Sequence, residues 1–299
     1  MNKEIKGVMP ALVTPLMEDG LSLNALAFRR LIDYHKKQGA YGFYITGGTG
    51  EGLVLSMDTK KKAISEAVSA IGDDALKIVH IADMNFENTK RLAKYAEDAG
   101  ADMISAIPPI YFDYDSDDIY NYYKEIAAQV KIPLMLYYTP SANTVLDTAF
   151  FTRLLEIDNV TSIKWTMNGY YKLIELLTVA GDDKVKIVNG PDETLVSGLS
   201  AGCAGGIGST YNLMLPWYKK IYESYRAGDM ATALETQKKA NKVINVIIKY
   251  KVIPSIKAVL DVMGFEAGPA TYPQTQYTSE MKQKIFDELL AAGFDPNMM

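Results

Sequence analysis

A lysine ends a short apolar segment, Val160-Thr161-Ser162-Ile163-Lys164, whose alternation is typical of a β-strand. A period of two places Val160, Ser162 and Lys164 on one face and Thr161 and Ile163 on the other. If the small Ser162 faces a barrel interior, Lys164 lies at the barrel mouth, where partial shielding disfavours the ammonium and leaves free amine to attack a carbonyl. Lys164 is therefore a candidate for an imine-forming nucleophile. The alternative from spacing alone is a lysine that extends into solvent.

Two tyrosines, Tyr137 and Tyr138, end the preceding apolar segment, and only one of them can share the inward face. A phenol at that place can pass protons between a substrate and an imine nitrogen. Most buried tyrosines, however, simply pack and find one hydrogen-bond partner. A proton relay and a packing role both remain open from the residues alone.

Two glycine-rich runs could bind an anion. The first, Gly47-Gly48-Thr49-Gly50-Glu51-Gly52, offers several backbone N–H groups and a hydroxyl, or forms only a tight turn between a strand and a helix. It is not the dinucleotide-binding fingerprint, because the third glycine does not stand at the required offset. The second run, Gly205 to Thr210, falls in the last strand-and-helix unit, where barrels often hold phosphate. Carboxylate and phosphate are therefore both candidate ligands.

Acidic residues and a histidine have several interpretations. Asp192 and Glu193 could accept hydrogen bonds from sugar hydroxyls, or could favour a helix N-terminus. His80 lies in an apolar segment and is predicted to be a core histidine. A cluster of four aspartates is predicted to begin a solvated helix, because the glycine and terminal glutamate of a calcium-binding loop are missing. These aspartates are Asp113, Asp115, Asp117 and Asp118.

The segments that must position these residues are short β-branched or apolar runs, each followed by a stretch long enough for a helix. Eight such units in about 225 residues match the size of a (β/α)8 barrel, although an open doubly wound sheet gives the same local pattern. The predicted strands are Gly7 to Thr14, Tyr41 to Thr46, Lys77 to Asp83, Met103 to Ile107, Pro133 to Tyr138, Val160 to Lys164, Val185 to Asn189 and Gly205 to Ser209.

After Tyr211 only helical patterns follow. We expect an α/β fold with a (β/α)8 TIM barrel as catalytic domain over residues 1–225. A C-terminal helical extension, residues 226–299, is expected to pack on the barrel. The predicted helices after Tyr211 are Tyr218 to Tyr225, Ala231 to Tyr250, Ser255 to Val262 and Ser279 to Ala292.

The composition argues against several classes of protein. A chain of 299 residues that is 48% hydrophobic can bury one large core. Its formal net charge of -5 provides no broad cationic field, so a nucleic-acid partner is not expected. The single cysteine, the lack of a signal-peptide pattern and the lack of a membrane-length apolar segment favour a cytoplasmic protein with no membrane partner. With only two histidines and no cluster at metal-ligand spacing, we expect no metal.

Four motifs in combination resemble the family of N-acetylneuraminate lyase and dihydrodipicolinate synthase, over almost the whole chain. They are Gly47-Gly48-Thr49-Gly50-Glu51, Tyr137-Tyr138-Thr139-Pro140, Ile163-Lys164-Trp165-Thr166 and Gly208-Ser209-Thr210-Tyr211-Asn212. The resemblance implies a barrel in which Lys164 forms a Schiff base, Tyr137 relays protons, and the loop with Gly48 and Thr49 holds the substrate carboxylate. It also implies a homotetramer with Tyr111 near the active site.

The lyase branch of the family is the more similar one, because Asn189-Gly190-Pro191-Asp192-Glu193 resembles its sugar-binding turn. The arginine that usually holds a second carboxylate in the synthase branch is replaced here by Ala142. By the likeness to the lyase branch, the sugar-derived chain of the substrate contacts Thr166, Gly190, Asp192, Glu193 and Ser209.

Three positions depart from the family pattern and leave the identity of the sugar acid open. Gly48 stands where a hydroxyl residue is usual, Tyr138 where an asparagine is usual, and Pro191 where the lyase often has an aromatic residue.

We expect a class I aldolase that cleaves a sialic-acid-like 2-keto sugar acid, N-acetylneuraminate by resemblance, to pyruvate and N-acetylmannosamine. No cofactor is expected, because the iminium is itself the electron sink. The alternatives are a 2-keto-3-deoxy sugar acid aldolase or dihydrodipicolinate synthase of the same family, a phosphate-binding barrel enzyme, and a non-catalytic keto-acid-binding barrel.

Overall fold

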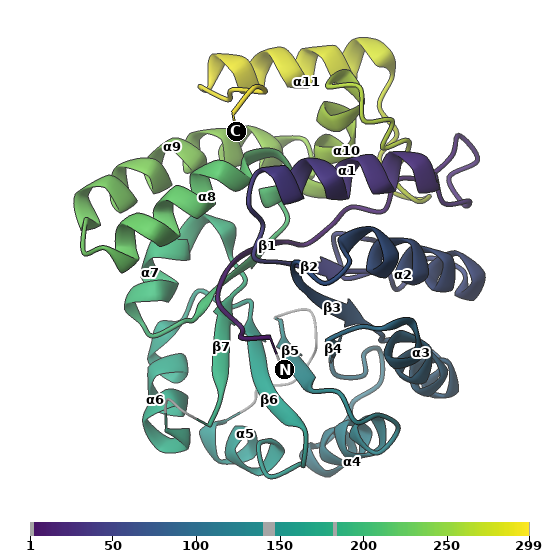
Figure 1. Ribbon diagram of the computed structural model, residues 1–299, viewed down its shortest axis with the longest axis vertical. Helices are drawn as coiled ribbons and strands as arrows, with labels where there is room; N and C mark the ends of the chain where they lie inside the picture. Colours follow the sequence, from purple (N-terminus) through teal and green to yellow (C-terminus); the bar gives the residue numbers. More distant parts are fainter. Residues whose placement is uncertain (1–2, 140–146, 182–183, 299) are drawn as a thin grey trace.

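A computed structural model describes residues 3–139, 147–181 and 184–298. Parallel strands form one eight-stranded sheet in the order β1-β8-β7-β6-β5-β4-β3-β2 (Figure 1). The sheet closes on itself, since Ala11 and Tyr44 form a parallel bridge and the Leu12 N–H donates to the Tyr44 carbonyl over 2.9 Å. The predicted (β/α)8 barrel is confirmed, and the open doubly wound sheet is wrong. The strands are β1 (Gly7–Pro10), β2 (Gly42–Ile45), β3 (Leu76–His80), β4 (Met103–Ala106), β5 (Leu134–Tyr138), β6 (Val160–Trp165), β7 (Lys186–Asn189) and β8 (Gly205–Gly208).

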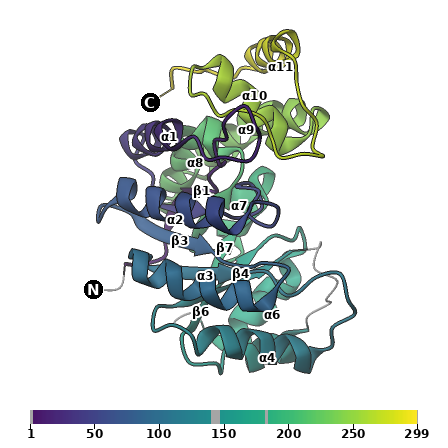
Figure 2. The same ribbon diagram turned by 90° about the vertical axis from the view of Figure 1, so that its right-hand side faces the viewer.

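Helices surround the strands, and Figure 2 shows α1 to α4 lying side by side along the outside of the barrel. Helices α9, α10 and α11 follow the last barrel helix and pack around α8 and against one another (Figure 1). The helices are α1 (Ala25–Lys37), α2 (Met57–Ile71), α3 (Phe86–Ala99), α4 (Ser116–Ala127), α5 (Thr148–Leu154), α6 (Tyr170–Ala180), the 3-10 helix η1 (Asp192–Thr194), α7 (Leu195–Ser200), α8 (Tyr211–Arg226), α9 (Met230–Lys249), α10 (Val252–Val262) and α11 (Ser279–Ala291).

Two predicted strands are too long at their C-terminal ends, while the other strand limits agree within one residue. The first ends at Pro10 and not at Thr14, because pairing then changes partner: the Ala11 N–H still donates to β8, but the next N–H donates to β2. The third ends at His80 and not at Asp83. Beyond His80 the chain turns toward α3, where the Asp83 N–H donates to Thr89 Oγ1 over 3.0 Å.

The predicted helix Tyr218 to Tyr225 begins too late, since α8 starts at Tyr211. Pro216 interrupts the sequence pattern, and Met214 has non-helical angles (φ -128, ψ 29) that divide α8 into two segments. Proline is tolerated in the first turn after such a break, because its missing N–H has no acceptor to lose there. The proline therefore marks a kink inside the helix, and not the absence of a helix.

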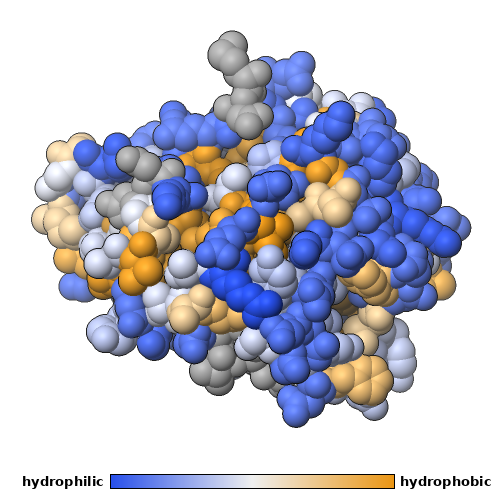
Figure 3. Space-filling view, turned by 90° about the horizontal axis from the view of Figure 1, so that it is seen from below, coloured by the Kyte–Doolittle hydropathy of each residue, from blue (hydrophilic) through white to orange (hydrophobic). Residues whose placement is uncertain are grey.

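Three groups of buried side chains hold the molecule together. One lies inside the barrel, one lies between the barrel and helices α1 to α6, and one joins β1, α7 and α8 to the C-terminal helices. None of the helices in the described ranges combines the length and apolar character needed to cross a membrane. The face seen from below Figure 1, where α4 and α5 lie, carries hydrophobic residues in separate patches among hydrophilic ones (Figure 3).

Candidate active site

Lys164 and Tyr137 meet at the ends of neighbouring strands, since the register of β5 and β6 pairs them directly. The Lys164 Nζ lies 3.8 Å from the centroid of the Tyr137 ring and 5.6 Å from that of the Tyr44 ring. It also donates a hydrogen bond to Thr166 Oγ1 over 3.2 Å. Lys164 is only 5% exposed, which excludes the lysine that extends into solvent.

The strand alternation that we predicted around Lys164 is present in the structure. Ser162 is fully buried inside the barrel, where its hydroxyl contacts Met103 Sδ at 3.5 Å. Ile163 and Trp165 instead belong to the core between barrel and helices. The period of two therefore directs the amine toward the interior of the barrel mouth.

The electrostatic environment of Tyr137 suits a group that exchanges protons. Burial raises the pKa of this phenol, but the Lys164 ammonium and polar interactions with Lys164 and Thr166 outweigh burial, so that the pKa lies below its ordinary value. A lowered phenol pKa brings the acid and base forms closer in free energy near neutral pH. Tyr137 can thus both give and accept a proton beside the amine.

The other tyrosine of the pair points away from the barrel interior. Tyr138 packs in the outer core with ring centroids 4.9 Å from Trp165 and 5.2 Å from Phe151. Only one tyrosine shares the inward face, as the alternation predicted. Tyr138 therefore cannot supply the hydroxyl that Gly48 lacks.

Two further polar aromatic side chains lie inside the barrel, and the polar atoms of both form hydrogen bonds. The Nδ1 of His80 lies 3.2 Å from the Thr46 carbonyl, and its Nε2 accepts from the Ile107 N–H over 3.3 Å. Burial lowers the pKa of His80 to about 3, which keeps the ring neutral and supports the predicted core histidine. Tyr44 donates to Ser105 Oγ over 2.9 Å, and burial raises its pKa well above the ordinary value.

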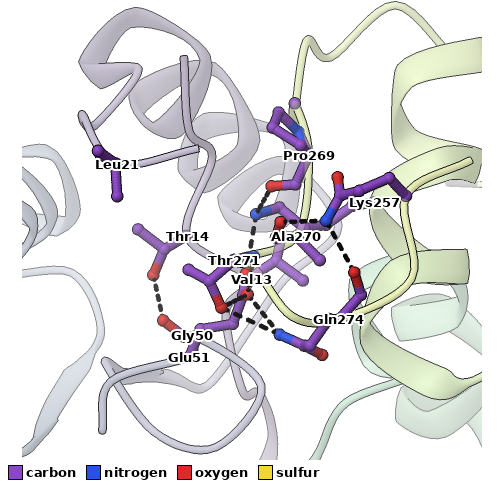
Figure 4. Close-up of polar contacts among 12 residues, drawn as sticks. Val13, Thr14, Leu21, Gly50, Glu51, Lys257, Pro269, Ala270, Thr271 and Gln274 are labelled. Atoms are coloured by element: carbon purple, nitrogen blue, oxygen red, sulfur yellow. Dashed lines mark hydrogen bonds and ion pairs between the residues drawn. The ribbon is translucent and has the colours of Figure 1, made fainter. Parts of the chain in front are cut away.

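The first glycine run forms the turn between β2 and α2 and faces the last strand. Thr14 Oγ1 donates to the Gly50 carbonyl over 2.7 Å (Figure 4), and Thr49 Oγ1 lies 2.7 Å from Ser209 Oγ. In the described part of the chain, no acceptor is found for the N–H groups of Gly48 and Thr49. Such N–H groups at the mouth of a barrel are available to an anion.

A pocket of about 560 Å³ adjoins Thr166 and brings together the five residues predicted to contact the sugar. One side is polar and the other, facing α9 and α10, is apolar. The lining residues with polar side chains are Thr166, Asn168, Asp192, Glu193, Ser209 and Thr210, and Gly169 and Gly190 line the pocket as well. The apolar lining residues are Met167, Pro191, Ile244, Ile247, Ile248 and Val252.

The two acidic residues of this pocket differ in environment. Asp192 is buried, and its Oδ2 accepts from both the N–H and the hydroxyl of Thr210 over 2.7 Å, while its Oδ1 has no partner among the described residues. Burial raises the pKa of Asp192 to about 6, although the Thr210 hydrogen bonds act in the opposite direction. Glu193 is half-buried. Both residues also begin η1, so the predicted role at a helix start applies as well.

Glycines around the pocket are required by close packing. A Cβ at Gly190 would lie 2.1 Å from Thr166 Oγ1, and one at Gly208 would lie 2.0 Å from Asp192 Oδ1. A Cβ at Gly206 would lie 2.4 Å from the Tyr211 hydroxyl. The second glycine run belongs to β8 itself, and packing accounts for its glycines without a phosphate.

Helix α9 contributes residues that the sequence did not point to. Gln237 and Asn241 donate to two backbone carbonyls of η1 over 3.0 Å each, and Ile244 and Ile248 continue the same helical face into the pocket wall. The spacing of these residues is readable in the sequence, but their partners lie more than forty positions away. The helical extension is therefore part of the pocket.

The structure does not bring Tyr111 into this pocket within one chain. Its side chain is 77% exposed, and its backbone has a φ of 87°, a left-handed conformation that is rare for a bulky residue. Its ring lies edge-on to Phe112 with centroids 5.0 Å apart. The placement near an active site stays a prediction that depends on assembly.

Other features of the sequence have structural explanations. Asp115 accepts from the N–H groups of Asp117 and Asp118 and caps α4, so the acidic cluster begins a helix as predicted. Within residues 3–139, 147–181 and 184–298, no group of three or more His, Cys, Asp or Glu side chains could hold a metal ion. Pro140 of the second motif and Ala142, the position of the missing arginine, lie outside the described residues.

A second cavity of about 470 Å³ lies at the opposite ends of β7 and β8, away from Lys164. It contains the single cysteine, Cys203, whose pKa is raised by burial to about 12. A thiol of that pKa supplies almost no thiolate at neutral pH, so the cavity has no nucleophile of this type.

Comparisons with known proteins agree with this geometry. An N-acetylneuraminate lyase of Rhizobium meliloti is 32% identical over 270 residues, 90% of this chain and 89% of the relative. The structure of an N-acetylneuraminate lyase from Mycoplasma synoviae superposes with a TM-score of 0.90 at 32% identity, covering 97% of this chain and 98% of the other. A Clostridium difficile structure in complex with mannosamine gives a TM-score of 0.92 at 28% identity, covering 97% and 99%.

The family model described as the dihydrodipicolinate synthetase family matches residues 4–292, which is nearly the full length. With the barrel, the buried lysine and these relatives in agreement, the chain belongs to the dihydrodipicolinate synthetase family.

Proposed function

We propose that this protein is a Schiff-base aldolase, a carbon–carbon lyase that cleaves a sialic-acid-like 2-keto sugar acid, N-acetylneuraminate, to pyruvate and N-acetylmannosamine. The observation that carries the proposal is the buried Lys164 Nζ held 3.8 Å from the ring centroid of Tyr137, beside a pocket with one polar wall. The lyase names of the relatives and the mannosamine in one of them support the same substrate class.

The reaction begins when the free amine of Lys164 attacks the C2 ketone of the substrate. Tyr137 moves protons between the substrate oxygen and the nitrogen, water leaves, and an iminium forms. The iminium nitrogen accepts the electron pair of the C3–C4 bond as it breaks, while the C4 hydroxyl loses its proton to become an aldehyde. A proton then adds to C3 of the remaining enamine, and water hydrolyses the resulting iminium to release pyruvate and the free amine of Lys164. Because the iminium is the electron sink, we propose that no cofactor takes part.

Recognition of the two ends of the substrate is divided between the turn that follows β2 and the segments that follow β6, β7 and β8. We assign the substrate carboxylate to the N–H groups of Gly48 and Thr49, which have no acceptor in the described part of the chain. We assign the hydroxylated tail to the polar wall of the pocket. Its residues are Thr166, Gly190, Asp192, Glu193 and Ser209.

The competing functions are those of other enzymes that form a Schiff base with a 2-keto acid, and that of a binding protein with the same fold. A 2-keto-3-deoxy sugar acid aldolase or a synthase would use the same lysine with a different second substrate, and a non-catalytic keto-acid-binding barrel would bind pyruvate without aldol turnover. The polar side chains that line the pocket beside Thr166 favour a hydroxylated tail. Turnover assays with N-acetylneuraminate, 2-keto-3-deoxy sugar acids and pyruvate alone distinguish these functions.

We further propose that residues 1–225 form the catalytic barrel, that residues 226–299 form an extension completing the pocket, and that the protein works in the cytoplasm. The proposed assembly is a homotetramer in which Tyr111, exposed in the single chain, lies near an active site. Sedimentation of the purified protein measures the assembly directly, and a monomer with full activity would contradict it.

The experiment that tests the central proposal is reductive trapping. Pyruvate with borohydride should irreversibly label Lys164, because reduction captures an iminium and not a carboxylate complex. Peptide mass spectrometry locates the adduct. Absence of an adduct, or an adduct that persists in Lys164→Ala, would defeat the Schiff-base mechanism.

A further inference from the structure

The glutamate that ends the first motif, Glu51, is buried under the C-terminal extension. Its side chain has no exposed surface, and its backbone adopts a φ of 59°, in the left-handed region. Its Oε1 lies 2.8 Å from Lys257 Nζ, which is itself 1% exposed. Its Oε2 accepts from the N–H and hydroxyl of Thr271 and from Gln274 Nε2, each over 2.6 Å (Figure 4).

All four of these donors come from the extension and none from the barrel. Lys257 is held in turn by the Pro269 carbonyl at 2.6 Å. A carboxylate that accepts several hydrogen bonds and one ion pair is fixed in position more firmly than one exposed to water. The extension thus fixes the place of Glu51.

The backbone of Glu51 passes this constraint to the residues that face the barrel mouth. Its N–H donates to the Gly48 carbonyl over 3.0 Å, which closes the turn around Thr49. The same turn is held by Thr14 from the segment that follows β1 and by Ser209 from the segment that follows β8. The orientation of the Gly48 and Thr49 N–H groups therefore depends on Glu51 as well as on the barrel.

We propose that the buried Glu51–Lys257 pair is a positioning device that sets the carboxylate-binding turn for substrate, so that the helical extension controls anion recognition from outside the barrel. Glu51 and Lys257 are positioning residues, because their buried side chains contact each other and act on the turn through the Glu51 backbone. The proposal rests on the proposed function, in which this turn binds the substrate carboxylate.

The test uses Lys257→Met in the full-length protein and the rate of Lys164 reduction by cyanoborohydride at increasing pyruvate concentration. A displaced turn should raise the half-saturating pyruvate concentration on the order of tenfold, the scale of losses caused by small misplacements. The limiting rate at saturating pyruvate should change far less, because Lys164 and Tyr137 are untouched. Measurements are made well below the melting temperature of the variant, since removing one partner of a buried pair destabilises the fold.

The rate of trapping with acetone is the control. A general loss of structure would lower this rate, whereas a displaced carboxylate-binding turn would not. Acetone forms an imine with the lysine but has no carboxylate for the turn to hold. Its trapping rate in Lys257→Met should equal that of the wild type. A variant damaged at Lys164 would lose both reactions together.

Two further variants keep the test decisive. Lys282→Met breaks a different ion pair of the extension, with Asp261 at 2.5 Å, and should keep the wild-type half-saturating concentration. Gln274→Leu removes one donor to Glu51 at a half-buried position and should shift pyruvate in the same direction as Lys257→Met, by less.

The outcomes separate the two proposals. No pyruvate adduct in the wild type overturns the proposed function. A wild-type adduct, with unchanged pyruvate half-saturation in folded Lys257→Met and Gln274→Leu, overturns only the positioning role. Equal shifts in Lys257→Met and Lys282→Met, or loss of the acetone reaction with the pyruvate reaction, also overturn it.

Discussion

Thr49 Oγ1 and Ser209 Oγ lie 2.7 Å apart, so the loops that follow β2 and β8 are joined across the end of β1. Each residue belongs to a different proposed subsite, Thr49 to the carboxylate and Ser209 to the sugar tail. A substrate that fills both subsites therefore meets two hydroxyls that already share one hydrogen bond. Gly48, next to this contact, is the departure from the family pattern whose effect is easiest to measure.

Gly48→Ser should fold like the wild type and raise turnover of N-acetylneuraminate. A Cβ at Gly48 would have no atom within 4 Å, the backbone does not require glycine, and Tyr138 is turned away from the site. The added hydroxyl can then assist proton transfer or hold the carboxylate. Steady-state kinetics on the sugar acid, with pyruvate trapping as the control, measure the effect.

If Gly48 instead leaves room for a bulkier substrate, Gly48→Ser will weaken binding of that substrate while pyruvate labelling stays intact. Unchanged kinetics on every active keto acid would contradict both explanations. The glycine would then have no part in the reaction.

Tyr137→Phe should lower kcat by about 100-fold or more, since general acid–base groups typically contribute that much. The ring remains and its packing against the Lys164 amine is preserved, so pyruvate should still bind. Comparison of kcat with the pyruvate dissociation constant checks this expectation. Turnover equal to that of the wild type would show that the tyrosine is structural.

Glu193→Gln should impair cleavage of a long sugar acid and spare imine formation with pyruvate. Glu193 lines the pocket and is half-buried, so glutamine replaces one of its two acceptor oxygens by an amide donor with little cost to the fold. The two reactions are assayed on the same preparation. Equal losses in both would mean that the residue supports the turn and does not contact the sugar.

Asp192→Asn should change how stability depends on pH. The folded-state pKa of Asp192 is raised by burial from 3.8 to about 6, so the folded protein binds this proton more tightly than the unfolded chain. Tighter proton binding stabilises the folded protein. This contribution to the free energy of unfolding is complete below about pH 4 and is lost as the pH rises through about 6. Asparagine cannot ionise. The melting temperature of Asp192→Asn relative to wild type should therefore increase between pH 4 and pH 7, and a pH-independent difference would contradict the raised pKa.

Local patterns were enough to predict the barrel and the direction of its reactive side chains. The alternation through Ser162 and Lys164 depends only on strand geometry, and it separates Tyr137 from Tyr138 in the same way. The sequence shows glycines at strand ends, but it does not show which close contacts require them. That Gly190 must admit Thr166 Oγ1 follows only from the packed structure.

Contacts made across long stretches of chain were not predicted. The sequence pattern places Glu51 only in a turn, although its partners Lys257 and Thr271 stand in the extension. Gln237 and Asn241 of α9 were likewise missed, because nothing local tells which side of a helix will meet η1. The missing information is the packing of α9 and α10 against the barrel, which depends on many apolar contacts at once.

The Glu51–Lys257 pair can form only late in biosynthesis. Its two residues are separated by 206 positions, and Thr271 stands 220 positions after Glu51. A nascent chain in which β8 has already emerged, and every strand of the barrel is present, still lacks all donors for the Glu51 carboxylate. Loss of the last helices through a premature stop codon would therefore leave a complete set of strands with an unpaired acid beside the substrate loop.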